Sequence, residues 1–329
     1  MATARAGTTG IGASIVPYAS VLALFIVAGL LPQAGPSGQL MSLATGVVIY
    51  AIAGAGLGFL WGQAGQLTLA HASVFGIGAY AAAVAAKHYG FSFVESLPLS
   101  TGLGLIAGAL VALPSLRTSG HYFVILTFAI GEVITVFAMR LESLTGGVNG
   151  ITTLPGAQTL FGLRLGGRAD YYVVVVGFAA IVFLILLAMA RSRWGVILRS
   201  MRENPELATS LGVNIPMHRI LAYAVSGAVA GLAGQLYLYY VKSIAPESFN
   251  SNLSIVFLLV VLLGGKSFLL GPLIGSLVYL LLPDYLGLTP VRSQIAFGVI
   301  LIVMILLAPG GLMSLFGRAR AKFRKRPAS

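Results

Sequence analysis

The chain has 329 residues, of which 58% are hydrophobic and only 9% are charged. Soluble domains carry about 25% charged residues, so this composition excludes a soluble globular protein and predicts an integral membrane protein. The net charge of +12 gathers in segments 191–219 and 318–326, which favours anionic lipid over nucleic acid as its partner. Cysteine is absent, which excludes disulfide bonds, thiolate nucleophiles and cysteine metal sites.

Ten apolar segments resemble membrane-spanning helices when about 18 to 20 residues are taken as the length of one crossing. They predict an all-α integral membrane protein with about ten transmembrane helices, some of them short or broken. The predicted spans are residues 14–31, 39–60, 67–86, 97–114, 121–139, 171–190, 218–241, 253–264, 267–283 and 293–310. This divides the chain into an N-terminal segment 1–13, a transmembrane domain 14–310 and a basic tail 311–329.

Basic residues predict which ends of the spans face the cytoplasm, because short loops rich in Arg and Lys are retained on that side. Segment 191–217 and the tail 311–329 are both basic, so both are expected to be cytoplasmic. An even number of crossings must then separate them. The stretch 253–283 is therefore interpreted as two short spans joined by a turn at Gly264 and Gly265, and the N-terminus is placed in the cytoplasm.

A polar, glycine-rich segment at residues 62–80 follows the second span and runs into the third. Polar side chains and irregular backbone at membrane depth persist only where other helices or water satisfy them, so this segment is expected to face the interior. We interpret its polar side chains as lining a substrate pathway: Gln63, Gln66, Thr68, His71 and Ser73. For His71, a hydrogen bond that holds helices together is the more frequent role of such a residue.

Glu132 lies near the middle of span 121–139, where an ionisable group is costly unless it is paired or hydrated. It is interpreted as a member either of the pathway or of a structural network. Gly264 and Gly265 join the pathway hypothesis because residues 65–80 align weakly with residues 264–279. Such interrupted segments in the two halves of a transporter point to its translocation path.

The segment 140–170 is too polar and too broken by glycine to form a further span. The same count of crossings places it in the periplasm. A segment of this length is interpreted as a folded cap or docking surface, with a flexible connector as the alternative.

Within segment 191–217, residues 204–212 carry the signals of a short helix. Asn204 is suited to cap it, Glu206 lies near its positive end, and Gly212 stops it. Leu207, Ala208 and Leu211 have the three- and four-residue spacing of one helix face. This apolar face predicts docking of a partner, and a helix lying on lipid headgroups is the alternative.

Catalytic chemistry is not indicated by the sequence. The four histidines do not occur at the spacing of metal ligands, and no Ser/His/Asp set or carboxylate pair clusters in one loop. We therefore predict no catalytic residue, no metal site and no cofactor in this chain.

Several motifs resemble those of one family of membrane proteins. Residues 65–72, followed by 76–80, are similar to the signature of branched-chain amino acid ABC transporter permeases of the LivM/LivH type. Further LivM-like segments follow in LivM order, at residues 120–133, 145–151, 231–234, 264–275 and 308–312. The spacing of Glu206, Ala208 and Gly212 resembles the cytoplasmic loop through which ABC importer permeases couple to their ATPases, although Leu207 replaces the usual first alanine.

This resemblance covers about residues 40–315 and implies an ABC importer permease fold. It also implies a transport subunit without enzymatic activity of its own, located in the bacterial inner membrane. The implied partners are a second, LivH-like permease, two ATP-binding subunits that bind the ATP, and a periplasmic substrate-binding protein.

The resemblance favours branched-chain or related small amino acids as cargo. The uncharged polar side chains of the pathway suit a zwitterionic or neutral molecule, so urea or a short amide is the alternative cargo. A stand-alone secondary transporter or channel, with Glu132 or His71 as a proton relay, is the alternative of a different class. The short helix at 204–212 favours the importer, since a stand-alone transporter has no ATPase to dock there.

Overall fold

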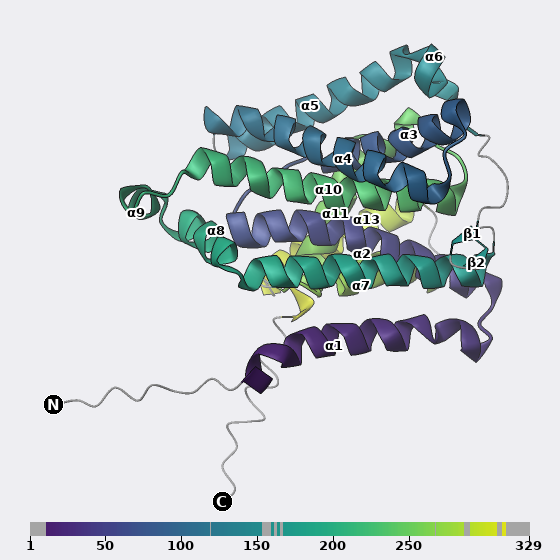
Figure 1. Ribbon diagram of the computed structural model, residues 1–329, viewed down its shortest axis with the longest axis horizontal. Coiled ribbons are helices and arrows are strands. Elements are labelled where there is room, and N and C mark those ends of the chain that lie inside the picture. Colours follow the sequence, from purple (N-terminus) through teal and green to yellow (C-terminus); the bar gives the residue numbers. More distant parts are fainter. Residues whose placement is uncertain are drawn as a thin grey trace, which may run out of the picture.

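The structure is a computed structural model that describes residues 11–118, 120–152, 159–160, 163–164, 167–266, 268–285, 290–307 and 311–313. Within these residues the chain is almost entirely helical (Figure 1). The long helices are α1 (Ile11–Gly29), α2 (Gly38–Ala64), α3 (His71–Tyr89), α4 (Phe93–Ala112), α5 (His121–Arg140), α7 (Arg168–Arg191), α10 (Ile215–Val241), α11 (Ser251–Gly264), α12 (Gly271–Tyr285) and α13 (Pro290–Leu307).

Short elements connect these helices. They are the 3-10 helices η1 (Leu31–Ala34), η2 (Leu113–Leu116), η3 (Gly147–Asn149) and η4 (Pro246–Phe249), and the helices α6 (Glu142–Thr145), α8 (Arg193–Glu203) and α9 (Pro205–Ser210). Two-residue strands β1 (Thr159–Leu160) and β2 (Leu163–Arg164) pair antiparallel.

The all-α membrane fold predicted from the sequence is confirmed. Each of the ten predicted spans coincides with one long helix of the described chain. Seven helices in the described residues are both long enough and apolar enough to cross a membrane, and residues 271–283 form a shorter apolar helix. The number of ten crossings therefore stays a prediction, whereas a membrane protein with several crossings is established.

Glycines bring three helices of the core into backbone contact. A Cβ atom added to Gly104 of α4 would lie 2.5 Å from the carbonyl oxygen of Gly227 on α10, and one added to Gly78 of α3 would lie 2.3 Å from the Cα of Gly231. Only glycine permits such an approach, which is common between membrane helices. The small-residue pair Gly227 and Gly231 therefore has the packing role expected of that spacing.

The molecule has two distinct ends (Figure 1). We call the one that carries α8 and α9 the α8 end, and the opposite one, with α6 and the β1–β2 hairpin, the α6 end. Arg191, at the end of α7, lies over the ring of Tyr18 in α1, so the first turns of α1 lie at the α8 end. Gly311, which follows α13, lies against Gly265, so the chain leaves α13 at the same end. Residues 1–10 and the basic residues 318–326 lie outside the described residues.

Part of segment 140–170 is folded onto the body of the protein at the α6 end. Ile151 forms an antiparallel bridge with Ile244, in which each residue's N–H binds the other's carbonyl oxygen at 2.8 and 2.9 Å. The hydroxyl of Thr145 donates to the carbonyl oxygen of Ala138 at 2.6 Å, which closes the end of α5. This favours a folded cap for residues 142–152, and residues 153–158 lie outside the described part of the chain.

Candidate functional site

The segment Gly65–Ala70 links α2 to α3 without forming a helix. Gly65 ends α2 in the left-handed region, with a φ of 69°, a conformation that glycine adopts without strain. The backbone that follows stays non-helical through Ala70, so α3 begins at His71 and not at residue 67, where the sequence placed the start of the span. Backbone of this irregular kind inside a membrane protein needs other partners for its free N–H groups.

Hydroxyl groups from distant parts of the chain supply those partners. The hydroxyl of Thr127 on α5 accepts the N–H of Leu69 at 3.0 Å. The hydroxyl of Ser254 on α11 accepts the N–H of Ala72, also at 3.0 Å. Within the segment, Thr68 accepts the N–H of Ala70 at 3.1 Å. The start of α3 is thus fastened to both α5 and α11.

His71 and Ser73 extend the same network. Nε2 of His71 donates to the carbonyl oxygen of Ala53 on α2 at 2.9 Å, because a carbonyl can only accept. The hydroxyl of Ser73 donates to the carbonyl oxygen of Gly131 on α5 at 3.1 Å. Both side chains are buried, as expected of a segment that faces the interior. In this state both side chains hold neighbouring helices together.

Glu132 connects α5 to the beginning of α11. Its Oε1 accepts the backbone N–H of Ser251 at 3.2 Å and also the hydroxyl of Ser251. A carboxylate is favoured at this position because the first N–H groups of a helix lack internal partners and form its positive end. The half-buried Glu132 is therefore a member of a structural network in this structure.

The two glutamines lie apart from this network. Oε1 of Gln63 accepts from Nη1 of Arg199 at 2.8 Å, at the α8 end, and Gln66, three residues later, is half-buried. The pathway candidates therefore do not form one continuous polar line in this conformation. Within the described chain, no group of three or more His, Asp or Glu side chains could hold a metal ion.

Gly264 ends α11, and Gly265 begins the turn to α12 that the sequence predicts at this place. A Cβ atom on Gly264 would overlap the backbone of Gly271, and one on Gly275 would overlap the carbonyl of Val260, so the two helices run antiparallel as a tight hairpin. A Cβ atom on Gly62 of α2 would lie 2.3 Å from the carbonyl oxygen of Lys266. The two weakly similar turns, 65–70 and 265–270, thus lie close together at the α8 end.

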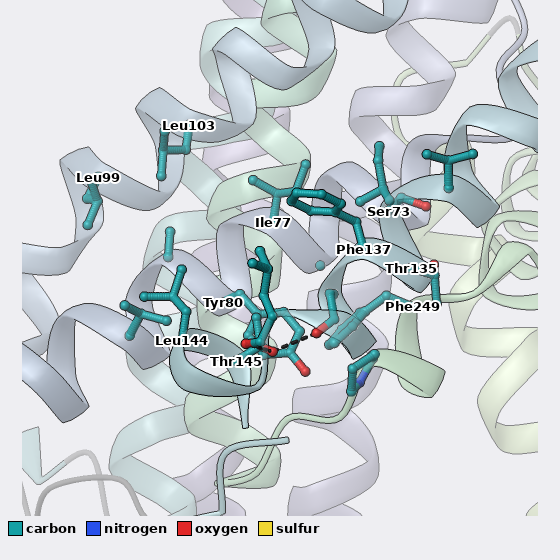
Figure 2. Close-up of a pocket in the computed structure, with 18 residues that line it drawn as sticks. Ser73, Ile77, Tyr80, Leu99, Leu103, Thr135, Phe137, Leu144, Thr145 and Phe249 are labelled. Atoms are coloured by element: carbon teal, nitrogen blue, oxygen red, sulfur yellow. Dashed lines mark hydrogen bonds between the residues drawn. The ribbon is translucent and has the colours of Figure 1, made fainter. Parts of the chain in front are cut away.

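A cavity of about 460 Å³ lies between α3, α4 and α5, in the half of the molecule toward the α6 end (Figure 2). Its walls are aliphatic and aromatic apart from a few hydroxyl groups, and no charged side chain is among the lining residues. The lining residues are Ser73, Gly76, Ile77, Tyr80, Ala81, Val84, Leu99, Leu103, Val133, Ile134, Thr135, Phe137, Ala138, Leu141, Leu144, Thr145, Pro246 and Phe249.

One hydroxyl in the cavity wall has no partner in the described structure. Ser73 and Thr135 both donate to Gly131, and Thr145 donates to Ala138, but the buried hydroxyl of Tyr80 is unpartnered. A buried hydroxyl without a partner is costly, so the Tyr80 hydroxyl would gain from any polar group that reached it. Sequence reasoning missed the cavity because its residues look like ordinary span residues, and only Ser73 was singled out.

The basic segment 191–217 contains two helices where the sequence indicated one. The helix α8 is capped by Ser192 and buries Leu198 and Met201, and Asn204 then caps α9 by accepting the N–H of Leu207 at 3.0 Å. Pattern reading missed α8 because its arginines dominate the composition. Gly212 follows α9 with a φ of 85°, which fits its predicted role as the stop.

The predicted apolar face of α9 is divided in the structure. Leu207 and Leu211 are 56% and 76% exposed, whereas Ala208 is only 2% exposed and packs against the hydrophobic core of the helix bundle. The short helix thus packs against the protein through Ala208, and the side chains of Leu207 and Leu211 face outward. Glu206 is also exposed. The two exposed leucines are the part of this face that is free to meet another protein.

Comparison with known proteins identifies the family. Residues 39–309 match the family described as the permease component of branched-chain amino acid transport systems. The chain is 27% identical to the high-affinity branched-chain amino acid transport permease LivM of Salmonella typhimurium, over 92% of this chain and 76% of that protein. Identity and coverage are the same for LivM of Escherichia coli.

A further relative is the probable branched-chain amino acid transport permease LivM of Methanocaldococcus jannaschii, which is 28% identical over 67% of this chain and 68% of that protein. No solved structure matches the chain. The family match covers most of the chain and includes the hydroxyl-fastened turn, the cavity and α9. The chain therefore belongs to the family of permease components of branched-chain amino acid transport systems, and it is a permease subunit of an ABC importer.

Proposed function

We propose that this permease carries branched-chain or related small aliphatic amino acids. The observation that supports this cargo is the cavity between α3, α4 and α5. Its volume of about 460 Å³ falls within the range of about 300–1,000 Å³ that small-molecule sites occupy. Aliphatic walls favour a cargo with an apolar side chain, which a branched-chain amino acid has and urea lacks.

The cavity is suited to passage more than to tight retention. No charged side chain lines it, so the ammonium and carboxylate groups of an amino acid would find no ion pair there. The hydroxyl of Tyr80 offers one hydrogen bond. Affinity is then expected to reside in a separate binding protein, and the permease releases its cargo readily.

We assign the two ends of the molecule to the two sides of the inner membrane. The α8 end carries the arginine-rich segment and is placed in the cytoplasm together with both termini. The α6 end is placed in the periplasm, where it meets a substrate-binding protein. Two ATP-binding subunits, which hold the ATP, complete the importer at the α8 end.

A second, LivH-like permease is proposed to pack against α5. This helix presents large apolar side chains outward, among them Tyr122 at 80% exposure and Ile125 at 67%. Val133 and Phe137 are also exposed, near the cavity. A partner that covers this face of α5 would also complete the open wall of the cavity.

Transport by the reconstituted importer tests the cargo. The complex of both permeases, both ATPases and the binding protein should show ATP-dependent uptake of radiolabelled leucine, isoleucine or valine into liposomes. Uptake of urea but not of these amino acids, or uptake that continues without ATP, would contradict the proposal.

Paired variants on α4 test whether the cavity lies on the path. Leu103 lines the cavity, and Leu105 of the same helix is similarly exposed but does not line it. We expect Leu103→Trp to lower leucine uptake about tenfold by filling the cavity, while Leu105→Trp changes it by less than about twofold. Equal effects of the two variants would exclude the cavity from the path.

Removal of single hydroxyl groups gives a finer test. Tyr80 and Tyr223 both have buried hydroxyl groups without partners in the described structure, but only Tyr80 lines the cavity. Loss of one hydrogen bond to the cargo predicts a fall in leucine uptake of about threefold to tenfold for Tyr80→Phe. Tyr223→Phe serves as the control and should leave uptake unchanged.

Charge on α9 tests the ATPase contact. Leu211→Asp places a carboxylate on the exposed apolar face and should abolish co-purification of the ATP-binding subunits while the permease still inserts. Val196→Asp, at an exposed apolar position of α8, is the control. Loss of the ATPases in both variants, or in neither, would contradict the assignment of docking to α9.

A further inference from the structure

A second cavity, of about 280 Å³, lies at the α8 end between α2, α7 and α12. Its rim carries three basic side chains, Arg191 at the end of α7, Arg199 on α8 and Lys266 in the turn after α11. The floor comes largely from apolar residues of long helices: Ala55, Gly58, Phe59, Leu187, Ala190 and Pro272. The cavity thus combines an apolar floor with a rim of basic side chains.

No acidic side chain is among the described residues that line this cavity. Like charges gathered around a small volume repel one another, and a bound anion would relieve that repulsion. Nothing in the transport function proposed above uses these cations, because the cargo cavity lies toward the opposite end. The charge distribution therefore points to a separate ligand that is anionic.

Neighbouring groups hold all three cations in place, and the guanidinium carbon of Arg191 lies 5.7 Å from the ring centroid of Tyr18. Nη1 of Arg199 donates to Oε1 of Gln63 at 2.8 Å and to the carbonyl oxygen of Ala190 at 2.7 Å. These bonds leave other guanidinium N–H groups for a ligand, and a side chain already held loses little entropy on binding. Nζ of Lys266 lies 4.9 Å from the ring centroid of Trp61, within range of a cation–π contact.

We propose that this cavity binds the phosphate-bearing headgroup of an anionic phospholipid from the leaflet at the α8 end. The layering of the site matches that ligand, because its basic rim meets the phosphate and its apolar floor meets the start of an acyl chain. Basic pockets between transmembrane helices bind such headgroups in general. A free phosphate ion would satisfy the cations but would leave the apolar floor unused.

Lipid binding to the full-length chain tests the proposal directly. The protein is purified in detergent, incubated with phosphatidylglycerol or phosphatidylcholine, and examined by native mass spectrometry. We expect phosphatidylglycerol to bind about tenfold more tightly than phosphatidylcholine, a difference that one or two charge-assisted hydrogen bonds can supply.

A matched pair of double variants locates the binding. Arg199→Gln combined with Lys266→Gln should reduce the preference for phosphatidylglycerol to less than about twofold. The control combines Arg117→Gln with Arg193→Gln, which removes the same charge from two exposed arginines outside the cavity lining. The control should keep the preference.

Several results would overturn the proposal. Equal binding of the two lipids, or equal loss in both double variants, would reduce the effect to diffuse surface charge. Displacement of phosphatidylglycerol by millimolar inorganic phosphate would make the site one for a soluble anion. Displacement by the ATP-binding subunits would show that an acidic protein group occupies the cavity.

A fluorescence measurement keeps the test valid if the double variant does not fold. Trp61 lies beside Lys266, and Trp194 is the other tryptophan of the chain. In the variant Trp194→Phe, lipid with brominated acyl chains should quench Trp61 more strongly when it is phosphatidylglycerol than when it is phosphatidylcholine. Equal quenching by the two brominated lipids would contradict a headgroup-specific site.

Discussion

Two helices that both pack beside α3 are held in opposite ways. α4 meets α10 through glycines, backbone against backbone, as at Gly104 and Gly231. α5 is attached through side-chain hydrogen bonds, from Thr127 and Gly131 to the start of α3 and from Glu132 to α11. The glycine contact has one closely fitted arrangement, whereas hydrogen bonds can break and reform with other partners.

The contrast indicates which part of the permease can move. α5 also exposes much of its surface and forms one wall of the 460 Å³ cavity. Elements that move during function are drawn from the less stable parts of a fold, with few buried apolar contacts. The glycine-packed helices are therefore expected to act as the fixed frame, and α5 as the adjustable wall of the pathway.

The largest expected effect is at the glycine contact. Gly104→Leu should lower stability by about 3 kcal/mol, because its Cβ would lie 2.5 Å from the carbonyl oxygen of Gly227 and would force α4 away from α10. Gly102→Leu on the same helix is the control, since a Cβ there has no heavy atom within 4 Å. Thermal unfolding in detergent measures both. Equal stability of the two variants would show that the frame tolerates separation.

A smaller effect is expected where a hydroxyl supports the irregular backbone. Ser254→Ala removes the acceptor of the Ala72 N–H, and the orphaned buried donor should cost about 1–2 kcal/mol. Ser276→Ala on α12 is the matched control, because the buried Ser276 hydroxyl bonds only within its own helix, to Leu273. If both variants lose the same stability, the fastening by Ser254 has no special weight.

The sequence predicts the positions of the helices better than their attachments. Apolar runs of membrane length, together with signals such as Asn204 and Gly212, place the helices because these rules act over a few neighbouring residues. The interior position of His71 follows from the cost of polar groups in lipid. The exact start of α3 differs because residues 65–70 stay outside a helix, with the Leu69 N–H bound by the hydroxyl of Thr127 on the distant helix α5.

Contacts between distant residues could not be predicted from the same rules. The hydrogen bond from the Ala72 N–H to the Ser254 hydroxyl joins residues 182 positions apart, and the residues next to either one give no signal that predicts it. The burial of Ala208 likewise depends on how α9 meets the helices behind it, so helical spacing alone does not separate Ala208 from the exposed Leu207 and Leu211. The cavity belongs to the same class, since its walls come from α3, α4 and α5.

A third variant tests the attachment of α5 to α11. Glu132→Gln keeps an acceptor for Ser251 but removes the negative charge at the positive end of α11, which should cost about 0.5–1 kcal/mol. Glu247→Gln, an exposed site in the first turn of η4, is the control and should have no measurable effect. An unchanged unfolding temperature for Glu132→Gln would indicate that the charge contributes nothing to this attachment.

The smallest effect is expected at Ser73, although it too links α3 to α5. Its hydroxyl donates to the carbonyl oxygen of Gly131, and that oxygen also accepts the hydroxyl of Thr135 at 3.0 Å. Ser73→Ala therefore leaves no buried group without a partner, and the loss should be at most about 0.5 kcal/mol. Thermal unfolding beside Ser254→Ala measures the difference. Suppose that Ser73→Ala lowered the free energy of unfolding as much as Ser254→Ala does. Each hydrogen bond to α3 would then stabilise the fold by itself, whether or not its loss leaves a backbone group without a partner. That result would weaken the case for α5 as the adjustable wall, because its bonds to α3 could not be exchanged cheaply.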